Sequence, residues 1–300
     1  MLAVLAAEPF SDPDWVYERK LDGIRCLAVR HGDTTRLFSR NRIEQSARFP
    51  ELVAALGRQP ASRFVVDGEI VAFERGVTSF ARLQQRGQRE VRVYYYLFDL
   101  LQLADHDTTR LALLDRKALL RASLRFAGPL RYTPHRGEHG TRFLEQACRR
   151  GWEGLIAKRA GSTYVHRRSR DWLKLKCVHS QELVIGGYTD PRGQRLAFGA
   201  LLVGYYAGGV LRYAGKVGTG FDEATLRRLG KRLAALEQRR SPFAEPVRER
   251  QTHWVRPRLV AQVAFSEWTR DGRLRHPRYL GLRDDKDARE VGRERAGRLG

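Results

Sequence analysis

The stretch that decides the fold is Glu18-Arg19-Lys20-Leu21-Asp22-Gly23-Ile24-Arg25. Apolar, β-prone residues flank it at 15–17 and 26–29, and Asp-Gly is a favoured turn pair because glycine accepts positive φ at no steric cost. We therefore expect a hairpin with Lys20 at the mouth of the strand pair. If the arginines of the octet or partial desolvation lower its pKa, Lys20 becomes a nucleophile toward a nucleotide phosphate. An ordinary hairpin with a solvated lysine is the alternative that the octet alone leaves open.

The bulk composition is that of a soluble, two-domain protein. A chain of 300 residues can form two cores, and its apolar content is 42%. No apolar run approaches the length of a membrane span, and residues 1–7 read as a packed first segment because they lack the basic region of a signal peptide. Cys26, Cys148 and Cys177 are widely spaced, which predicts buried free thiols in a reducing cytoplasm and neither a zinc site nor a disulfide framework.

The charge is less ordinary than the composition. There are 56 Lys and Arg against 34 Asp and Glu, so the net charge is +22. Both halves of the chain, divided at residue 180, are basic, and arginine, the better bidentate partner for phosphate, predominates. An arginine-rich coding background would explain this excess. The alternative is a nucleic-acid partner that contacts the whole body of the protein.

The texture of the sequence changes near residues 177–181. Before it, strand-like and helix-like segments alternate, whereas after it short strands and glycine-rich turns surround one basic helix. We expect an α+β protein with domains at 1–179 and 180–300, the second a small barrel such as an OB-fold. The expected strands are 37–40, 63–66, 70–73, 91–98, 183–188, 199–206, 211–217 and 259–265, with a turn at 67–68, and the expected helices are 49–56, 111–124, 140–150 and 222–239.

Further segments follow Lys20 in a fixed order. They are Ser39-Arg40-Asn41, Asp67-Gly68-Glu69, Tyr96-Leu97-Phe98-Asp99-Leu100-Leu101, Glu153-Gly154-Leu155-Ile156-Ala157-Lys158-Arg159, Trp172-Leu173-Lys174-Leu175-Lys176 and, near the end, the stretch 278–286. In this order they resemble the nucleotidyltransferase motifs of ATP-dependent DNA ligases and mRNA capping enzymes. Residues 185–190, 212–221 and 276–291 look similar to the ligase module of bacterial end-joining (LigD-type) ligases. The resemblance covers essentially the whole chain and implies an ATP-grasp-like adenylation domain of antiparallel sheets and helices, followed by an OB-fold β-barrel.

The resemblance assigns the groups that act on phosphorus. Lys20 would attack the α-phosphate of ATP and form lysine-AMP, the adenylate would pass to a DNA 5′-phosphate, and a 3′-hydroxyl would displace AMP. Lys174 and Lys176 alternate along a strand and so share one face, which the family places at the α-phosphate; a solvated strand face is the alternative. Glu153 matches the carboxylate that binds Mg²⁺ or Mn²⁺, and its alternative is a surface ion pair with the nearby basic residues 158 and 159.

Other matched positions would bind the nucleoside and the DNA phosphate. Glu69 would accept from the ribose hydroxyls, Phe98 would stack on adenine, and Glu18 would lie near the adenine amino group. Their alternatives are a turn-flanking acid, a core aromatic residue and a cross-strand charge partner. Arg25 and Arg40 would hold the ribose or phosphates, including the DNA 5′-phosphate. Two residues after Arg40, where the family usually has glycine, this chain has an arginine.

The second domain carries its own charged segment, with Arg278, Arg283, Asp285 and Lys286. In the family this domain closes over ATP, so Arg283 and Lys286 would reach the β- and γ-phosphates in the first step, and it then opens to embrace DNA. A solvated charged loop is the alternative for this segment.

The leading interpretation is an ATP-dependent DNA ligase core, in DNA repair or end joining. An RNA ligase or an mRNA-capping-type guanylyltransferase shares the lysine motif, and a non-catalytic basic nucleic-acid-binding protein is the alternative from another class. We expect a monomer associated with the bacterial nucleoid in the cytoplasm, acting on nicked or broken duplex DNA and not on a membrane. A Ku-like end-binding protein and a separate repair polymerase are the further partners to consider.

Overall fold

The computed structural model describes residues 1–87, 89–177, 180–191, 196–269, 271–294 and 296–297. The chain forms two compact units, one of Met1–Cys177 with the C-terminal residues from Arg295, and one of Val178–Glu294. The C-terminal strand β21 (Ala296–Gly297) belongs to the first unit because it pairs in parallel with β1 (Leu2–Ala6). In this respect the units differ from the expected division at residue 180.

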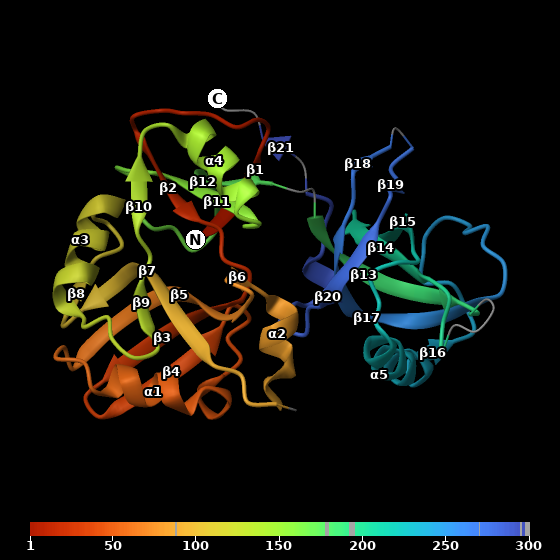
Figure 1. Ribbon diagram of the computed structural model, residues 1–300, viewed down its shortest axis with the longest axis horizontal. Coiled ribbons are helices and arrows are strands. Elements are labelled where there is room, and N and C mark those ends of the chain that lie inside the picture. Colours follow the sequence, from red (N-terminus) through yellow and green to blue (C-terminus); the bar gives the residue numbers. More distant parts are fainter. Residues whose placement is uncertain (88, 178–179, 192–195, 270, 295, 298–300) are drawn as a thin grey trace. The chain divides into compact units, whose positions relative to one another are not determined.

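The first sheet of unit 1 has the order β10-β2-β11-β12-β1-β21 (Figure 1). Its remaining strands are β2 (Trp15–Arg19), β10 (His135–Gly137), β11 (Gly154–Arg159) and β12 (Arg168–Lys176). Helix α4 (Gly140–Arg149) covers one face, since its apolar residues Phe143, Leu144 and Ala147 form a core with alternate residues of β2, β11 and β12. The opposite face of this sheet carries charged side chains, among them Glu18 and Lys174, beside apolar ones such as Trp172.

The second sheet of unit 1 has the order β4-β3-β5-β7-β8, with β6 beside β5 and β9 beside β7. Its strands are β3 (Ile24–His31), β4 (Thr34–Ser39), β5 (Arg63–Glu74), β6 (Val77–Thr78), β7 (Val93–Leu103), β8 (His106–Asp107) and β9 (Leu130–Tyr132). The helical segments are η1 (Ser46–Arg48), α1 (Pro50–Gly57), α2 (Phe80–Gln84), η2 (Gln85–Gly87) and α3 (Leu113–Ser123). Alternate buried residues of β3, β5 and β7 pack with α1 and α3 to form the largest core.

Two of the expected turns are wrong. β2 and β3 do not form a hairpin: β2 pairs in the first sheet and β3 in the second, so residues 20–23 carry the chain from one sheet to the other. Gly23 is required by a close approach, because a Cβ there would lie 2.2 Å from the carbonyl oxygen of Ile70. Asp67-Gly68 is not a turn either, since β5 runs unbroken through it. A Cβ on Gly68 would lie 2.5 Å from the carbonyl oxygen of Tyr96 on the next strand.

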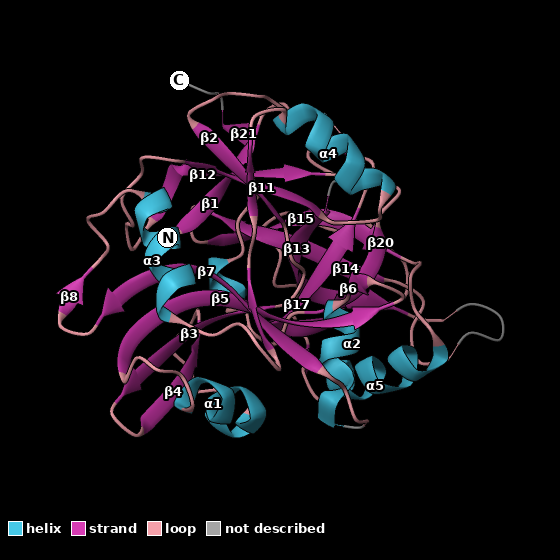
Figure 2. Ribbon diagram, turned by 60° about the vertical axis from the view of Figure 1, so that its left-hand side comes forward, coloured by secondary structure: helices cyan, strands magenta, loops and turns pink. Residues whose placement is uncertain are grey.

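Unit 2 is built around a sheet of order β15-β14-β13-β17-β16, with β20 beside β17. Its strands are β13 (Ser180–Thr189), β14 (Leu201–Ala207), β15 (Val210–Val217), β16 (Glu237–Gln238), β17 (Thr252–Ala264) and β20 (Arg278–Leu282), with the hairpin β18 (Glu267–Trp268) and β19 (Leu274–Arg275). A bridge between Thr219 and Arg278 connects the segment after β15 to β20, as in the expected OB-fold barrel. Strands dominate both units (Figure 2).

The basic helix of unit 2 is shorter than the sequence predicts. Helix α5 (Glu223–Ala234) is capped by Asp222, whose side chain accepts from the backbone of Thr225, and a short helix η3 (Ala288–Glu290) lies near the end of the unit. The sequence predicts a helix that continues to residue 239. Residues 237–238 instead form strand β16, which pairs with β17. Within the described residues, no helix is both long and apolar enough to span a membrane.

The expectation of three buried free thiols is wrong for two of them. Cys148, exposed at the end of α4, forms a disulfide with Cys177, which directly follows β12; their Cα atoms are 5.2 Å apart. Cys26 is a buried free thiol. A separation of 29 residues gives no local signal, because only the packing of α4 on the sheet brings the two cysteines together.

Candidate active site

The charged face of the first sheet gathers the predicted phosphate-binding lysines. Glu18 is in register with Ile156, which is in register with Lys174, and Gly154 is in register with Lys176. Residues directly opposite one another on neighbouring strands share a face of a sheet. Lys174 and Lys176 therefore lie on the face away from α4, together with Glu18.

Lys20 lies at the edge of this face and forms an ion pair. Its Nζ is 2.5 Å from Oε1 of Glu153, and the two side chains are 17% and 22% exposed. The backbone N–H of Lys20 donates to the carbonyl of Gly154 at 2.9 Å. Gly154 has φ of +147°, and a Cβ there would lie 2.0 Å from the carbonyl oxygen of Leu175. Only glycine permits this close approach of Lys20 and β12 around the start of β11.

The pKa of Lys20 is raised, contrary to the expectation that neighbouring arginines lower it. Burial acts to lower the pKa, but the carboxylates of Glu153, Asp22 and Glu69 outweigh it. The arginines point elsewhere: the guanidinium of Arg19 lies 4.5 Å from the ring centroid of Trp152, and that of Arg25 is paired with Asp67. In this state Lys20 is a protonated cation held by carboxylates.

Asp67 holds Arg25 in place. Nε and Nη2 of Arg25 donate to the two carboxylate oxygens of Asp67 at 3.0 and 2.5 Å, and the hydroxyl of Tyr164 donates to the same carboxylate at 2.8 Å. Burial acts to raise the pKa of Asp67, but Arg25 outweighs it and the pKa is lowered. The sequence offered Asp67 as a turn residue, and its role as a buried positioning group depends on pairing between distant strands.

Glu18 is buried between two lysines that sequence reasoning missed. Its carboxylate oxygens lie 2.6 Å from Nζ of Lys117 and 2.6 Å from Nζ of Lys158. Burial acts to raise the pKa of Glu18, but the two lysines lower it. Burial also lowers the pKa of Lys158 to about 8, although Glu18 opposes the shift. Charged residues are almost never fully buried unless paired, and nothing in the sequence pattern indicates this triad.

Phe98 faces the same cluster. Its ring is half-buried, with a centroid 4.3 Å from Nζ of Lys158 and 5.8 Å from the ring of Trp172 in an edge-on arrangement. Arg25 lies 5.6 Å from the same ring and is in register with Glu69 on β5. Phe98, Glu69 and Arg25 thus line one side of the site.

The turn after β4 places Arg40 beside a residue with unusual backbone geometry. Arg42, at the position where the family usually has glycine, has φ of +60°. Its N–H donates to the carbonyl of Ser39 at 2.9 Å, and the N–H of Ile43 donates to the Ser39 hydroxyl at 3.2 Å. The backbone at Arg42 therefore has the left-handed conformation that favours glycine, although arginine has a Cβ and adopts this conformation at a higher energetic cost.

Arg283 and Lys286 belong to unit 2, whereas Lys20 belongs to unit 1. Arg283 donates through Nε and Nη2 to the two oxygens of Asp285, both at 2.9 Å. Nζ of Lys286 lies 3.4 Å from Oε1 of Glu182. Both cations lie next to carboxylates of their own unit.

The carboxylates around Lys20 fit a divalent cation that also binds phosphate. Glu153, Asp22 and Glu69 all act on Lys20, although the described residues contain no group of three or more His, Cys, Asp or Glu that would hold a metal by themselves. Mg²⁺ is commonly bound through one or two carboxylates together with substrate phosphates and water. Glu153 is the member of this set in direct contact with Lys20.

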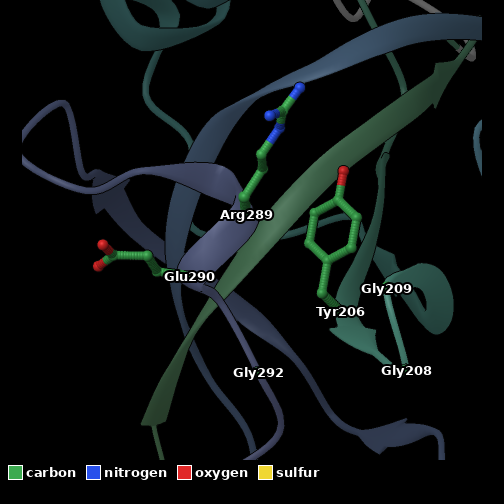
Figure 3. Close-up of a pocket in the computed structure, with 6 residues that line it drawn as sticks. All are labelled: Tyr206, Gly208, Gly209, Arg289, Glu290 and Gly292. Carbon is green, nitrogen blue, oxygen red and sulfur yellow. The ribbon is translucent and has the colours of Figure 1, made fainter.

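A separate pocket of about 710 Å³ lies in unit 2. Its lining residues are Tyr206, Gly208, Gly209, Arg289, Glu290 and Gly292. Arg289 and Tyr206 extend in the same direction, whereas Glu290 points away from both (Figure 3). None of the predicted site residues lines it.

Comparisons with known proteins agree with this geometry. Residues 1–176 match the family model of the ATP dependent DNA ligase domain, and residues 194–286 match that of the ATP dependent DNA ligase C terminal region. This chain belongs to the ATP-dependent DNA ligase family. The expected family, the α+β fold with an OB-fold domain, and the enzyme class of an ATP-dependent DNA ligase are thereby confirmed.

Relatives and solved structures extend this result. The ligase is 42% identical to the multifunctional non-homologous end joining protein LigD of Pseudomonas aeruginosa. The alignment extends over 306 residues and covers 98% of this chain and 36% of that protein. It is also 39% identical to the LigD of Mycobacterium tuberculosis. This alignment extends over 286 residues and covers 93% of this chain and 37% of that protein. A structure of mycobacterial DNA ligase D complexed with ATP and MES superposes with a TM-score of 0.69 at 35% identity and covers 98% of both chains. The ligase spans little more than a third of the length of these curated relatives.

Proposed function

We propose that this ligase seals 5′-phosphate/3′-hydroxyl breaks in duplex DNA through lysine-AMP and DNA-adenylate intermediates, with Lys20 as the nucleophile. The observation that supports it best is the contact of Lys20 with Glu153 beside the strand face that carries Lys174 and Lys176. A nucleophile, a carboxylate for a cation and two further cations are the groups that in-line displacement at phosphorus requires.

Each residue has a stated part in the first step. Lys20 gives its proton to solvent water, and its Nζ then forms a bond to the α-phosphorus as the bond from that phosphorus to the bridging oxygen of pyrophosphate breaks on the opposite side. Lys174 and Lys176 neutralise the charge that develops on the α-phosphate oxygens. Glu153 would hold a divalent cation, Mg²⁺ or Mn²⁺, which would supply Lewis-acid stabilisation of phosphate charge.

The groups proposed to bind the nucleoside and the DNA phosphate come from both sheets of unit 1. Glu69 accepts from the ribose hydroxyls, Phe98 stacks on adenine, and Glu18 lies toward the adenine amino group. Arg25, held by Asp67, and Arg40 bind phosphate, including the DNA 5′-phosphate in later steps. In the first step, Arg283 and Lys286 of the OB-fold unit orient the β- and γ-phosphates of ATP.

The wider role is double-strand break repair by end joining. Two observations support a DNA substrate that contacts both units. The relatives are named for non-homologous end joining, and the net charge of this chain is +22. A Ku-like end-binding protein and a repair polymerase are the proposed partners, the ligase itself is monomeric, and its place is the nucleoid. The chain spans about a third of the length of these relatives, so the partners and the wider role are proposed from the whole relatives and not from the matched part alone.

Incubation with ATP or GTP labelled at the α-phosphate, with a divalent metal and no DNA, tests the proposal. Label from ATP on the protein, followed by its transfer to a nicked duplex, supports the ligase. Label from GTP would indicate a capping-type enzyme. If neither ATP nor GTP labelled the protein, the result would indicate a binding protein. Parallel assays on nicked, cohesive and blunt DNA, with and without a Ku-like protein, test the role in end joining.

A further inference from the structure

The disulfide Cys148–Cys177 lies directly beside the proposed phosphate and metal groups. Cys177 follows Lys176 in the chain, and its backbone N–H donates to the carbonyl of Glu153 at 3.0 Å. Cys148 lies at the C-terminal end of α4, five residues before Glu153. The cross-link and this hydrogen bond therefore connect the end of β12 to the segment 148–153 at two points.

The short connection from Cys148 to Glu153 is a tight turn. The N–H groups of Gly151 and Trp152 donate to the carbonyls of Cys148 and Ala147, both at 3.0 Å, and Gly151 has φ of +69°. A movement of Cys148 is therefore transmitted to the backbone of Glu153 through few rotatable bonds. In the register of β11 and β12, Lys176 pairs with Gly154, the residue after Glu153. The same restraint thus acts on the proposed metal ligand and on one of the proposed phosphate-binding lysines.

We propose that Cys148 and Cys177 form a redox modification site, whose disulfide holds Glu153 and Lys176 in position for the cation and the α-phosphate, and whose reduction loosens both. This inference rests on the proposed function of Glu153 and Lys176.

The chemistry is thiol–disulfide exchange with a small disulfide such as oxidised glutathione. A cysteine thiolate attacks one sulfur of the reagent and releases one glutathione thiolate. The second cysteine thiolate then attacks the mixed disulfide and releases the other. Two cysteine thiols are oxidised, one reagent disulfide is reduced to two thiols, and the two cysteine protons end on the released glutathione. No other oxidant is required.

Accessibility differs sharply among the cysteines. Cys148 is exposed and Cys177 is half-buried. Cys26 is fully buried, and burial raises the pKa of its thiol to about 12. Cys26 is therefore an internal control that should not react under the same conditions.

Two quantities should change with the state of the pair. Loosening a group that orients a metal ligand typically costs metal affinity, so the reduced protein should need on the order of tenfold more Mg²⁺ for half-maximal formation of the adduct. Coupling between sites is reciprocal, so the bound ligand should in turn stabilise the disulfide. A tenfold coupling corresponds to a midpoint potential about 30 mV more negative in the presence of Mg²⁺ and a non-cleavable α,β-methylene analogue of ATP.

The experiment equilibrates the whole chain in glutathione buffers of graded potential and traps thiols by alkylation, with mass spectrometry to assign each cysteine. Wild type is compared with Cys148→Ser, which alters an exposed side chain, with Cys177→Ser, and with Cys26→Ser as the matched control. The expected result is a two-electron transition of Cys148 with Cys177 that shifts with Mg²⁺ and the analogue, with the Mg²⁺ requirement of Cys148→Ser fixed at the reduced value. Cys26→Ser should behave as wild type.

Two outcomes would overturn the inference: no disulfide across the buffers, or an identical Mg²⁺ requirement and potential in both states. Failure of the proposed function looks different, because neither oxidised nor reduced protein would then acquire label from ATP.

Discussion

Nζ of Lys20 lies 2.5 Å from Oε1 of Glu153, so the proposed nucleophile and the proposed metal ligand neutralise each other. A lysine in such a pair cannot attack phosphorus, because its lone pair carries a proton. A divalent cation held by Glu153 would compensate the charge of this carboxylate, which is the group that contributes most to raising the pKa of Lys20. We therefore expect metal binding to be coupled to deprotonation of Lys20.

Replacing the nucleophile should abolish the first step. We expect Lys20→Ala to reduce the covalent adduct to background and to leave the far-ultraviolet circular dichroism spectrum unchanged. Lys216→Ala is a matched control, since Lys216 is an exposed lysine paired with Glu249 in unit 2. Retention of label on a lysine of the Lys20→Ala protein would show that the nucleophile is another residue.

The rate of adduct formation should depend jointly on pH and metal. Burial acts to lower the pKa of Lys20, but Glu153 and its neighbours raise it above the ordinary 10.5, so at low metal concentration the rate should increase as pH rises above neutrality. More Mg²⁺ should shift this profile to lower pH, because the cation weakens the pull of Glu153 on the proton. Single-turnover labelling across pH at limiting and saturating Mg²⁺ measures both effects. A profile that ignores the metal concentration would contradict the coupling.

The cations of unit 2 should act mainly while the β- and γ-phosphates are present. Arg283→Ala and Lys286→Ala should each raise the activation free energy of adduct formation by about 2–4 kcal/mol, which lowers its rate by some two to three decades. Sealing of a pre-adenylated nick should be affected far less, since that substrate lacks both phosphates. Arg275→Ala, which removes an exposed arginine paired with Glu267, is the matched control. Equal losses in both assays would assign the segment to folding or DNA binding.

The buried triad should matter for stability. Glu18→Gln leaves Lys117 and Lys158 buried without their carboxylate, and removing one partner of a buried ion pair typically costs about 3–5 kcal/mol. The pKa of Glu18 is lowered in the folded protein, because the two lysines outweigh burial. The stabilisation is therefore present above its ordinary value of 4.5 and is lost as pH falls through the folded pKa. Urea unfolding at neutral and acidic pH measures this loss.

The matched control for that experiment is Glu44→Gln, at an exposed ion pair with Arg36, which should change stability little. If Glu18→Gln unfolded at the same urea concentration as wild type, the triad would carry no net stability.

Binding to DNA should weaken steeply with salt. Each neutralised phosphate contributes a slope of roughly −0.9 to log affinity against log salt concentration, and a charge of +22 on both units implies several contacts. Fluorescence anisotropy with a nicked duplex gives the slope directly. An affinity that is nearly flat from low to physiological salt would remove the electrostatic explanation of the charge.

Local patterns predicted helices α1, α3, α4 and α5 and most of the longer strands, and the order of the motifs predicted the family. They did not predict the short helix α2 or short strands such as β1, β6 and β10. They failed where a distant strand decides the outcome. The sequence signal of Asp22-Gly23 is the same whether the chain folds back as a hairpin or crosses to another sheet. The carbonyl of Ile70, which excludes any side chain at Gly23, lies on a strand far along the chain.

The same limit applies to charged groups. Lys117 and Lys158 look like surface residues, because only the fold reveals that both reach Glu18. The pair Arg116 and Asp99 is likewise fully buried, with Nε and Nη2 of Arg116 donating to the carboxylate at 2.7 and 2.9 Å. Asp99 belongs to a recognised motif, yet its contact is structural.

The unbroken run of β5 through Asp67, Gly68 and Glu69 has a consequence for how the site tolerates change. A turn absorbs an added residue by rearranging locally, whereas a paired strand keeps a strict period of two. One residue inserted between Asp67 and Glu69 would move one of the two carboxylates to the opposite side of the sheet, away from Arg25 or from Lys20. The spacing of the two acids is thus set by the alternation of side chains along β5, and the register shifts at Val65/Val66 and Asp67/Gly68 are accommodated by extra residues in the partner strand β7.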